Sequence, residues 1–455
     1  MNVSSTASVV VEGGGSQVVS HAGLHALGRF ADRIGLGTAL SDATVTESTR
    51  LPLHDRGKVM SHLLLVLAGG GENCADIEYL RVQRSLFRDV CSDSTLYRTM
   101  HELQPLALWR MKFAMAAVRA DVWKRMPEVW RSEGILDFDA SLVEVHSENK
   151  EHAAPTYKGG YGFHPLLCFF DGTGETLASM LRAGNAGAND VEDHTAVLDE
   201  AITQMPELFQ QGHHPGDDPS LARRDLTARA DSAGCTHGFI DACRERNVRF
   251  CVVARSCKKI GAAISFAIDN EKRWRRAVGQ DGKPKKGSAV AELTDLCDLS
   301  EWPEGTRLIV RREPLHPGAQ TTLFPDMDYR YWGFYTDRAG KPVEIDRFMR
   351  AHAHVEDGIC RQKDSGLERF PFTDFHANCA WLTAVGMSAT LVRWFQRLCL
   401  TGSLRVAKPK TLRWRLWHAP ARLIRSGRQT ILRFLDDWPD TEAILAVHSR
   451  IARLT

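Results

Sequence analysis

Three acidic residues stand at positions from which carboxylates could share metal ions. Asp139 lies within a mostly apolar, strand-like segment, Asp231 ends a second strand, and Glu356 lies inside a helical segment. Carboxylate oxygens are the ligands that Mg²⁺ prefers. Two such ions a few ångströms apart promote phosphoryl transfer, because one activates a water or hydroxyl and the other stabilises the leaving oxygen. The three acids therefore suggest chemistry on phosphodiesters.

Each acid also has a plainer interpretation. Strand alternation places Asp137 on the same face as Asp139, so either could be the ligand, or both could line the polar face of an edge strand. Asp231 could instead cap the helix that follows it. Glu356 and Lys363 are seven residues apart and could form an ordinary solvated helix face. Only the three acids together, in this order along the chain, favour a shared metal-binding site.

The segments around the acids have the order of a ribonuclease H-like core. They are strands at 135–145, 163–170 and 176–182, a helix at 193–204, a strand at 226–231, a helix at 236–246 and a strand at 249–254. The first three strands, joined by Gly-rich turns, predict an antiparallel meander. The whole alternation predicts an α/β fold, with a mixed sheet and flanking helices.

The remaining segments differ in character. Residues 258–338 contain several strand-like runs and predict a β-rich insertion. Helices at 344–364 and 378–400 follow, and Gly366 with Pro371 stops the first of them. Between residues 55 and 126 the pattern is helical, and Ser92 begins a short helix that suits either a helix-turn-helix or plain packing.

Composition excludes several classes of protein. The chain has 455 residues, 43% of them hydrophobic, and a formal net charge of only +2, so bulk charge does not indicate a polyanion partner. No apolar run approaches the roughly 20 residues of a membrane span, and the first residues lack a secretory signal. Eleven scattered cysteines without a Cys-x-x-Cys pair predict reduced thiols in a cytoplasmic protein.

Taken together, five blocks of this sequence resemble bacterial insertion-sequence transposases of the DDE class. The similarity is greatest to the insertion sequence thirteen-eighty group, within the insertion-sequence-four-like superfamily, and runs from about residue 50 to 435. The blocks are 137–141, 156–166, 181–189, 229–234, and 354–359 with 363–367.

The resemblance implies an activity, a cofactor and partners. It implies metal-dependent cleavage of double-stranded DNA at terminal inverted repeats and strand transfer into target DNA, by cut and paste through a hairpin intermediate. Mg²⁺ is the expected cofactor, with Mn²⁺ as a substitute. A homodimer is expected in the synaptic complex, with nucleoid association when bound to DNA and no membrane partner. A nuclease without strand transfer and a silent DNA-binding derivative are the alternatives.

The resemblance also assigns roles to residues. Asp139, Asp231 and Glu356 match the three catalytic, metal-binding acids. The wider family pattern places Tyr and Arg before the glutamate, where this chain has Met349 and His352. Lys363, at the expected spacing after Glu356, is the better candidate for a DNA phosphate contact than His352, and Lys158 in the second block is another.

Aromatic and basic residues extend the expected DNA contacts. In similar enzymes an insertion like 258–338 holds a flipped base, for which Trp274, Trp302 and Trp332 are candidates, with core packing as the alternative. The stretch 401–435 has many basic residues and no acid, which suits a DNA backbone or an amphipathic helix that closes the fold. The candidates there are Arg413, Arg415, Arg422 and Arg425.

We therefore expect six regions. They are a flexible or weakly ordered segment (1–45), a helical DNA-binding domain (46–130), the first part of the catalytic core (131–257), a β-rich insertion domain (258–338), the second part of the core with the glutamate helix (339–400), and a basic C-terminal region (401–455).

Overall fold

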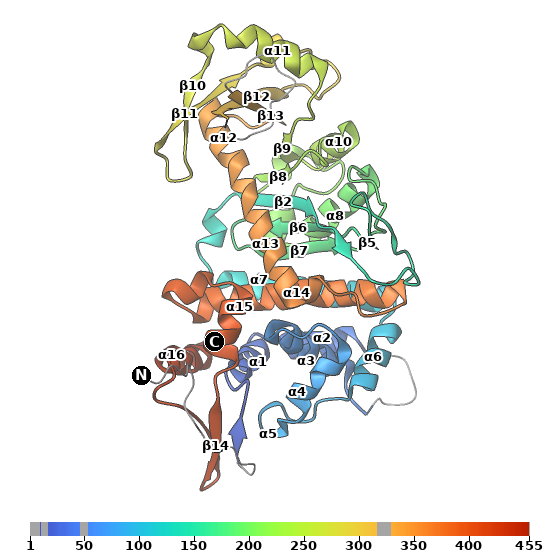
Figure 1. Cartoon of the computed structure of the whole chain (residues 1–455), viewed down its shortest axis with the longest axis vertical. Helices are drawn as coiled ribbons and strands as arrows, with labels where there is room; N and C mark the ends of the chain where they lie inside the picture. Colours follow the sequence, from blue (N-terminus) through green and yellow to red (C-terminus); the bar gives the residue numbers. More distant parts are fainter. Residues whose placement is uncertain (1–9, 11–16, 46–52, 316–328, 455) are drawn as a thin grey trace.

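A nine-stranded mixed sheet runs through the upper part of the molecule, and helices flank it (Figure 1). The computed structural model describes residues 10, 17–45, 53–315 and 329–454. From one edge to the other the strands are β10 (Arg275–Val278), β11 (Pro284–Glu292), β12 (Arg307–Pro314), β13 (Tyr329–Thr336), β9 (Val248–Val253), β8 (Leu226–Ala230), β2 (Gly134–Ala140), β6 (Leu166–Phe170) and β7 (Glu175–Met180).

The predicted meander and α/β order are confirmed. β2, β6 and β7 pair antiparallel, whereas β8 is parallel to β2 and β9 is parallel to β8. Helix α8 (Val191–Gln204) leads to β8, and α10 (His237–Glu245) connects β8 to β9. These parallel pairs bring the carboxyl ends of β2 and β8 to the same edge of the sheet.

Two predicted strands are interrupted. The first ends at Ala140 and resumes as β3 (Val143–Glu144), which pairs with β5 (Tyr161–Phe163) in a small separate sheet that also contains β4 (Ala154–Pro155). The second predicted strand is split between β5 and β6 at His164 and Pro165, because proline has no N–H to donate to a ladder.

The segment after β9 is not β-rich from its start. It begins with helix α11 (Lys258–Ile268), which buries Ile260, Ala263, Ile264 and Ala267 at helical spacing. Of the strands that follow, β11, β12 and β13 overlap the strand-like runs of the sequence, whereas β10 was not predicted, and β13 pairs with β9 over Phe334–Thr336. The strands of this segment therefore extend the central sheet.

The predicted helix at 344–364 is a succession of helical turns that crosses in front of the sheet (Figure 1). It consists of α12 (Pro342–Arg350), a 3₁₀ turn (Ala351–Ala353), α13 (His354–Gln362) and a π turn (Lys363–Leu367). Gly366, at φ +104°, ends it as predicted, because this backbone conformation disfavours any residue with a Cβ.

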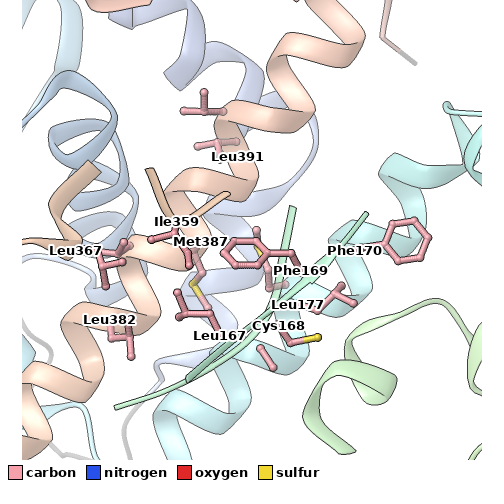
Figure 2. Close-up of a cluster of buried hydrophobic side chains, with 14 of the residues drawn as sticks. Leu167, Cys168, Phe169, Phe170, Leu177, Ile359, Leu367, Leu382, Met387 and Leu391 are labelled. Carbon is pink, nitrogen blue, oxygen red and sulfur yellow. The ribbon is translucent and has the colours of Figure 1, made fainter. Parts of the chain in front are cut away.

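A helical layer lies under the β7 side of the sheet. Helices α7 (Pro105–Lys124) and α14 (Phe375–Cys399) run across the molecule there, with α3 (Arg56–Gly69) beneath them (Figure 1). Figure 2 shows buried side chains from β6, β7, α13 and α14 gathered in one cluster, among them Phe169, Ile359 and Met387. This cluster attaches the helix that carries Glu356 to the core of the protein.

The N-terminal prediction is wrong for residues 24–43. Helices α1 (Leu24–Arg33) and α2 (Leu36–Ala43) bury Leu27, Phe30 and Leu40 completely, whereas 1–9 and 11–16 lie outside the described residues. The expected helices between 55 and 126 are present, and Ser92 caps α6 by accepting a hydrogen bond from Thr95 N–H. The other short helices of this part are η1 (Cys74–Ile77), α4 (Glu78–Arg81), α5 (Arg84–Phe87) and η2 (Val129–Arg131).

The basic C-terminal region is not an amphipathic helix. After α15 (Pro409–Leu412) and a π turn (Arg413–Trp417), it forms the hairpin of β14 (Ala421–Ser426) and β15 (Gln429–Phe434), which pairs with β1 (Val18–Val19). The alternating Arg422, Leu423, Ile424 and Arg425 suit a strand better than a helix.

Helix α16 (Thr441–Arg453) follows the hairpin. The remaining short elements are α9 (Glu207–Gln210), η3 (Pro219–Leu221), η4 (Glu271–Arg273), η5 (Thr294–Leu296) and η8 (Gly402–Val406).

Two expected absences concern the chain as a whole. All eleven cysteines lie among the described residues as free thiols. Across the described ranges, no helix combines the length and apolar character that crossing a bilayer requires.

Candidate active site

Asp139 and Asp231 lie side by side where two parallel strands end. Asp139 is the penultimate residue of β2, and Asp231 is the first residue after β8. The register pairs Phe138 with Ala230, so the next residue along each strand is one of these aspartates. Ligand sites of α/β sheets usually lie at the carboxyl ends of such strands.

Electrostatics shows that the three predicted acids lie near one another. Burial first, and then the negative charge of Asp231, raise the pKa of Asp139 from 3.8 to about 6. This net value includes smaller contributions from His352 and the Ala140 N–H, which lower the pKa, and from the charge of Glu356, which raises it. Asp139 is half-buried, and its Oδ1 accepts a hydrogen bond from Ala140 N–H at 2.7 Å. Its carboxylate therefore lies in the field of two other acids.

Asp231 does not cap the following helix. Its Oδ1 accepts a hydrogen bond from Ala233 N–H at 2.8 Å within the turn, and its side chain is exposed. The residue that caps α10 is Thr236, which accepts from Phe239 N–H. The capping interpretation of Asp231 is therefore wrong, and its second carboxylate oxygen has no hydrogen bond from a described residue.

Glu356 is presented by the helix that crosses the sheet. Val355 and Ile359 are buried on that helix, as the periodicity predicts, and Glu356 between them is exposed. Gly358 permits a close approach, because a Cβ there would lie 2.8 Å from the ring of Phe169 on β6. The small residue at 358 therefore brings the first turn of α13 down to the face that carries Asp139.

A buried ion-pair network distinguishes Asp137 from Asp139. Asp137 is 1% exposed, and both its oxygens accept from Arg229, at 2.8 Å from Nε and 2.6 Å from Nη2. Arg229 also pairs with Asp171 at 3.0 Å and donates to the Phe348 carbonyl. The carboxylate of Asp137 is thus occupied by a buried guanidinium, whereas that of Asp139 has no cationic hydrogen-bond partner among the described residues.

Two histidines attach the helix to this network. His352 Nδ1 lies 2.8 Å from Asp137 Oδ1, and His354 Nδ1 lies 2.9 Å from Asp171 Oδ1. The hydrogen bond with Asp171 raises the pKa of His354. Each contact joins the start of α13 to the sheet, so the pair sets where the following Glu356 can lie.

Three of these residues had no role in the sequence analysis. Arg229 is a charged residue inside an otherwise apolar strand, which is a usable signal of a buried pair. Asp171 was expected only as a turn residue, and His354 only as part of a block. Their contacts join residues far apart in the chain, so no local pattern predicts them.

The other predicted residues are distributed around the molecule. Lys363 is half-buried two turns after Glu356, and Lys158 is exposed, with its ammonium group 5.7 Å from the ring centroid of Tyr157. Arg413 is half-buried and donates to the Ala68 carbonyl at 3.4 Å, and burial lowers its pKa. Two others lie on the hairpin strand β14, namely Arg422 and Arg425.

Arg415 and the candidate tryptophans have intramolecular partners. Arg415 forms a two-pronged ion pair with Asp440, at 2.6 and 2.8 Å. Trp274 is 7% exposed and lies under the guanidinium of Arg312. Trp302 stacks on His237 with ring centroids 4.1 Å apart, and Trp332 packs against Phe334. Each of the three tryptophans therefore packs against another side chain of the protein.

The side chains at this site show whether it suits a metal ion. Within the described ranges, no group of three or more His, Cys, Asp or Glu side chains is already arranged to hold a metal ion. The three carboxylates nevertheless fit one in chemistry, because they are oxygen donors whose mutual repulsion raises the pKa of Asp139 and would be relieved by a cation.

The fold and the site thus define a mixed α/β protein with acidic residues at the carboxyl ends of two adjacent parallel strands. The chain belongs to the family described as transposase DDE domain group 1, whose family model matches residues 1–455. A comparison with curated proteins finds no match.

Among solved structures, the chain is similar to a piggyBac transposase synaptic complex with hairpin DNA, determined by cryo-electron microscopy. The similarity covers 87% of this chain and 79% of that chain, at 12% identity and a TM-score of 0.39. A TM-score this low indicates a loose likeness of arrangement, and nothing about function follows from it.

Proposed function

We propose that this transposase cleaves DNA at the ends of its own element and joins them to target DNA, with Asp139, Asp231 and Glu356 as its catalytic carboxylates. One observation carries the proposal: burial, together with the charges of Asp231 and Glu356 at the same sheet edge, raises the pKa of Asp139 to about 6. Clustered acids that destabilise one another are typical of functional sites.

Each acid has a distinct task in this proposal. Asp139 and Asp231, on adjacent strand ends, form the fixed side of the site, and Glu356 completes it from the helix. Bound Mg²⁺, or Mn²⁺ in its place, would supply activation of the attacking oxygen and stabilisation of the leaving oxygen. Arg229, His352 and His354 hold the helix and the strands in register, so that the three carboxylates stay on one face.

The reaction needs no other reactant. In cleavage, water attacks the phosphorus at the element end, the bond from phosphorus to the 3′ oxygen breaks, and the 3′ oxygen takes up a proton to become a hydroxyl. In joining, this hydroxyl gives up its proton and attacks a phosphodiester of the target, whose own bond from phosphorus to the 3′ oxygen breaks and leaves a 3′ hydroxyl on the target. Cut and paste through a hairpin means that the element's hydroxyl first attacks the opposite strand in the same way, which releases the flanking DNA with a 3′ hydroxyl, after which water hydrolyses the hairpin and restores the element's 3′ hydroxyl.

DNA contacts are assigned by exposure and charge. Lys363 follows Glu356 along the same helical run, and Lys158, Arg422 and Arg425 are cations without a described ion-pair partner. We propose these four as phosphate contacts. Arg413, Arg415 and His352 are engaged within the protein, so we propose that they support the fold. A homodimer would bring two element ends together.

Incubation of the full chain with duplexes that carry the terminal inverted repeats, a target plasmid and Mg²⁺ or Mn²⁺ tests the proposal. Asp139→Asn, Asp231→Asn and Glu356→Gln should each reduce cleavage about a thousandfold, the loss expected for about 4 kcal/mol of transition-state stabilisation. Asp357→Asn is the matched control, because Asp357 is the next acid on α13 but pairs with Arg361 at 2.5 Å.

The products separate the alternatives. Hairpin and joined products from the unmodified chain support cut and paste. Cleavage without either product would indicate a nuclease, and binding without cleavage would indicate a silent derivative. Full activity in Asp231→Asn would overturn the site.

A further inference from the structure

The C-terminal hairpin is a two-stranded arm that extends from the lower part of the molecule (Figure 1). β14 and β15 pair over six positions, from Ala421 with Phe434 to Ser426 with Gln429. The third strand, β1, covers only Val18 and Val19, so it pairs with the base of β14 and leaves the outer half of the arm as a bare ribbon.

The two faces of this ribbon differ. On one face Leu423 and Leu432 pack against the main hydrophobic core. Alternation places six side chains on the other face, and none of them belongs to that core. They are Arg422, Ile424, Ser426, Gln429, Ile431 and Arg433.

The outer face carries uncompensated positive charge. Arg422 lies directly opposite Arg433 in the ladder, an arrangement that destabilises an antiparallel pair. Beyond that face, Arg425 on the opposite side of the ribbon and Arg428 in the turn add two more exposed guanidinium groups toward the tip. None of these four arginines forms an ion pair with a described residue, whereas Arg415, just before the hairpin, is neutralised by Asp440. The ribbon therefore favours an anionic partner.

We infer that this hairpin enters the major groove of duplex DNA. Strands about 4.8 Å apart make a ribbon that fits a groove about 12 Å wide. Arg422 and Arg433 then reach phosphates at the base of the arm. Ser426 and Gln429, opposite each other at its tip, have the donors and acceptors that base edges pair with. The inference rests on the proposed function only in taking DNA as the ligand.

The test measures binding rather than chemistry. The full chain is titrated in EDTA into a labelled 30-base-pair duplex carrying a terminal repeat, and into an unrelated duplex and a single strand of the same length, at several salt concentrations. The arm variant is Arg422→Gln with Arg433→Gln. The charge-matched control is Arg131→Gln with Arg223→Gln, two exposed arginines that precede β2 and β8 and have no described ion-pair partner.

The arm variant should bind both duplexes at least tenfold more weakly at about 0.1 M salt, and its slope of log K against log salt should fall by about 2. Its melting temperature should stay the same or rise, because a like-charge pair is removed. Gln429→Ala should reduce the preference for the terminal repeat about tenfold while keeping the salt slope. The control should change neither binding nor slope.

Three results would overturn the inference: unchanged binding in the arm variant, a lowered melting temperature with an unchanged salt slope, or equal affinity for single-stranded DNA. A failure of the proposed function is distinguishable. If the chain does not cleave the terminal repeat, it should still bind DNA in EDTA. That binding should still weaken when Arg422 and Arg433 are replaced, even if the chain is catalytically silent.

Discussion

Asp137 and Asp139 are two residues apart on one strand face, yet removing their charges should have opposite effects on stability. The perturbation is the isosteric pair Asp139→Asn and Asp137→Asn, each measured without divalent metal. Asp139 is partly buried and lies among other acids, so neutralising it removes first the cost of burying its charge and then a repulsion. Asp137 is held by Arg229, so neutralising it leaves a buried cation with one partner fewer.

The magnitudes follow from the contacts. A rise in the pKa of Asp139 from 3.8 to about 6 corresponds to at most about 3 kcal/mol, and the partial exposure of the group reduces this to about 1–2 kcal/mol. Asp139→Asn should raise the free energy of unfolding by that amount at pH 7.5. Asp137→Asn should lower it by about 3 kcal/mol, since one charge of a buried pair is lost.

The pH dependence has a definite sign. Because the folded pKa is the higher one, the folded chain binds more protons than the unfolded chain between about pH 4 and 6. The stability of the unmodified protein therefore falls, relative to Asp139→Asn, as the pH rises through this window. The difference between the two proteins should be complete above about pH 6 and disappear below about pH 4.

Urea denaturation in EDTA, followed by intrinsic tryptophan fluorescence between pH 4 and 8, measures these differences. Titration with Mg²⁺ provides the second reading: it should stabilise the unmodified chain more than Asp139→Asn, because a cation relieves the same repulsion. If Asp139→Asn were as destabilising as Asp137→Asn, Asp139 would be a structural residue and the reasoning would fail. A Mg²⁺ effect equal in both proteins would refute the assigned ligand.

Two further substitutions test the support of the site. Arg229→Met should lower the free energy of unfolding by about 3–5 kcal/mol, because it leaves Asp137 and Asp171 without their shared guanidinium. Urea denaturation measures this loss, and a change below about 1 kcal/mol would contradict the prediction. Gly358→Ala should cost about 1–3 kcal/mol by driving a Cβ against Phe169, and should reduce cleavage by displacing Glu356. Cleavage that stayed unchanged in this variant would show that the close approach does not set the position of that carboxylate.

The sequence was informative wherever the signal is local. Hydrophobic periodicity placed the meander, the two strands that follow it and the helix that carries Glu356, and the buried Val355 and Ile359 confirm its face. The capping of α6 by Ser92 was equally local. The order of Asp139, Asp231 and Glu356 along these elements could therefore be predicted without a structure.

The prediction of secondary structure failed where packing between segments that are distant in the sequence determines the structure. The sequence predicted that residues 24–43 are weakly ordered, but α1 and α2 bury their apolar sides against other helices. For the basic tail, an amphipathic helix was one of two interpretations, whereas the tail forms strands, and their pairing with β1 involves residues some four hundred positions away. Tertiary contact overrides local propensity in such segments.

By itself the sequence determined the order of strands and helices and the set of acids at their ends, because side-chain periodicity and turn chemistry act over a few residues. Strand alternation left Asp137 as a rival of Asp139, since both occupy one face of one strand, and the family resemblance favoured Asp139. Only the tertiary structure shows how the surroundings of the two carboxylates differ. The parallel pairing of β2 with β8 sets Arg229 beside Asp137, and two positions further along the same two strands it sets Asp231 beside Asp139. One aspartate is therefore neutralised by a buried cation, and the other is left among acids.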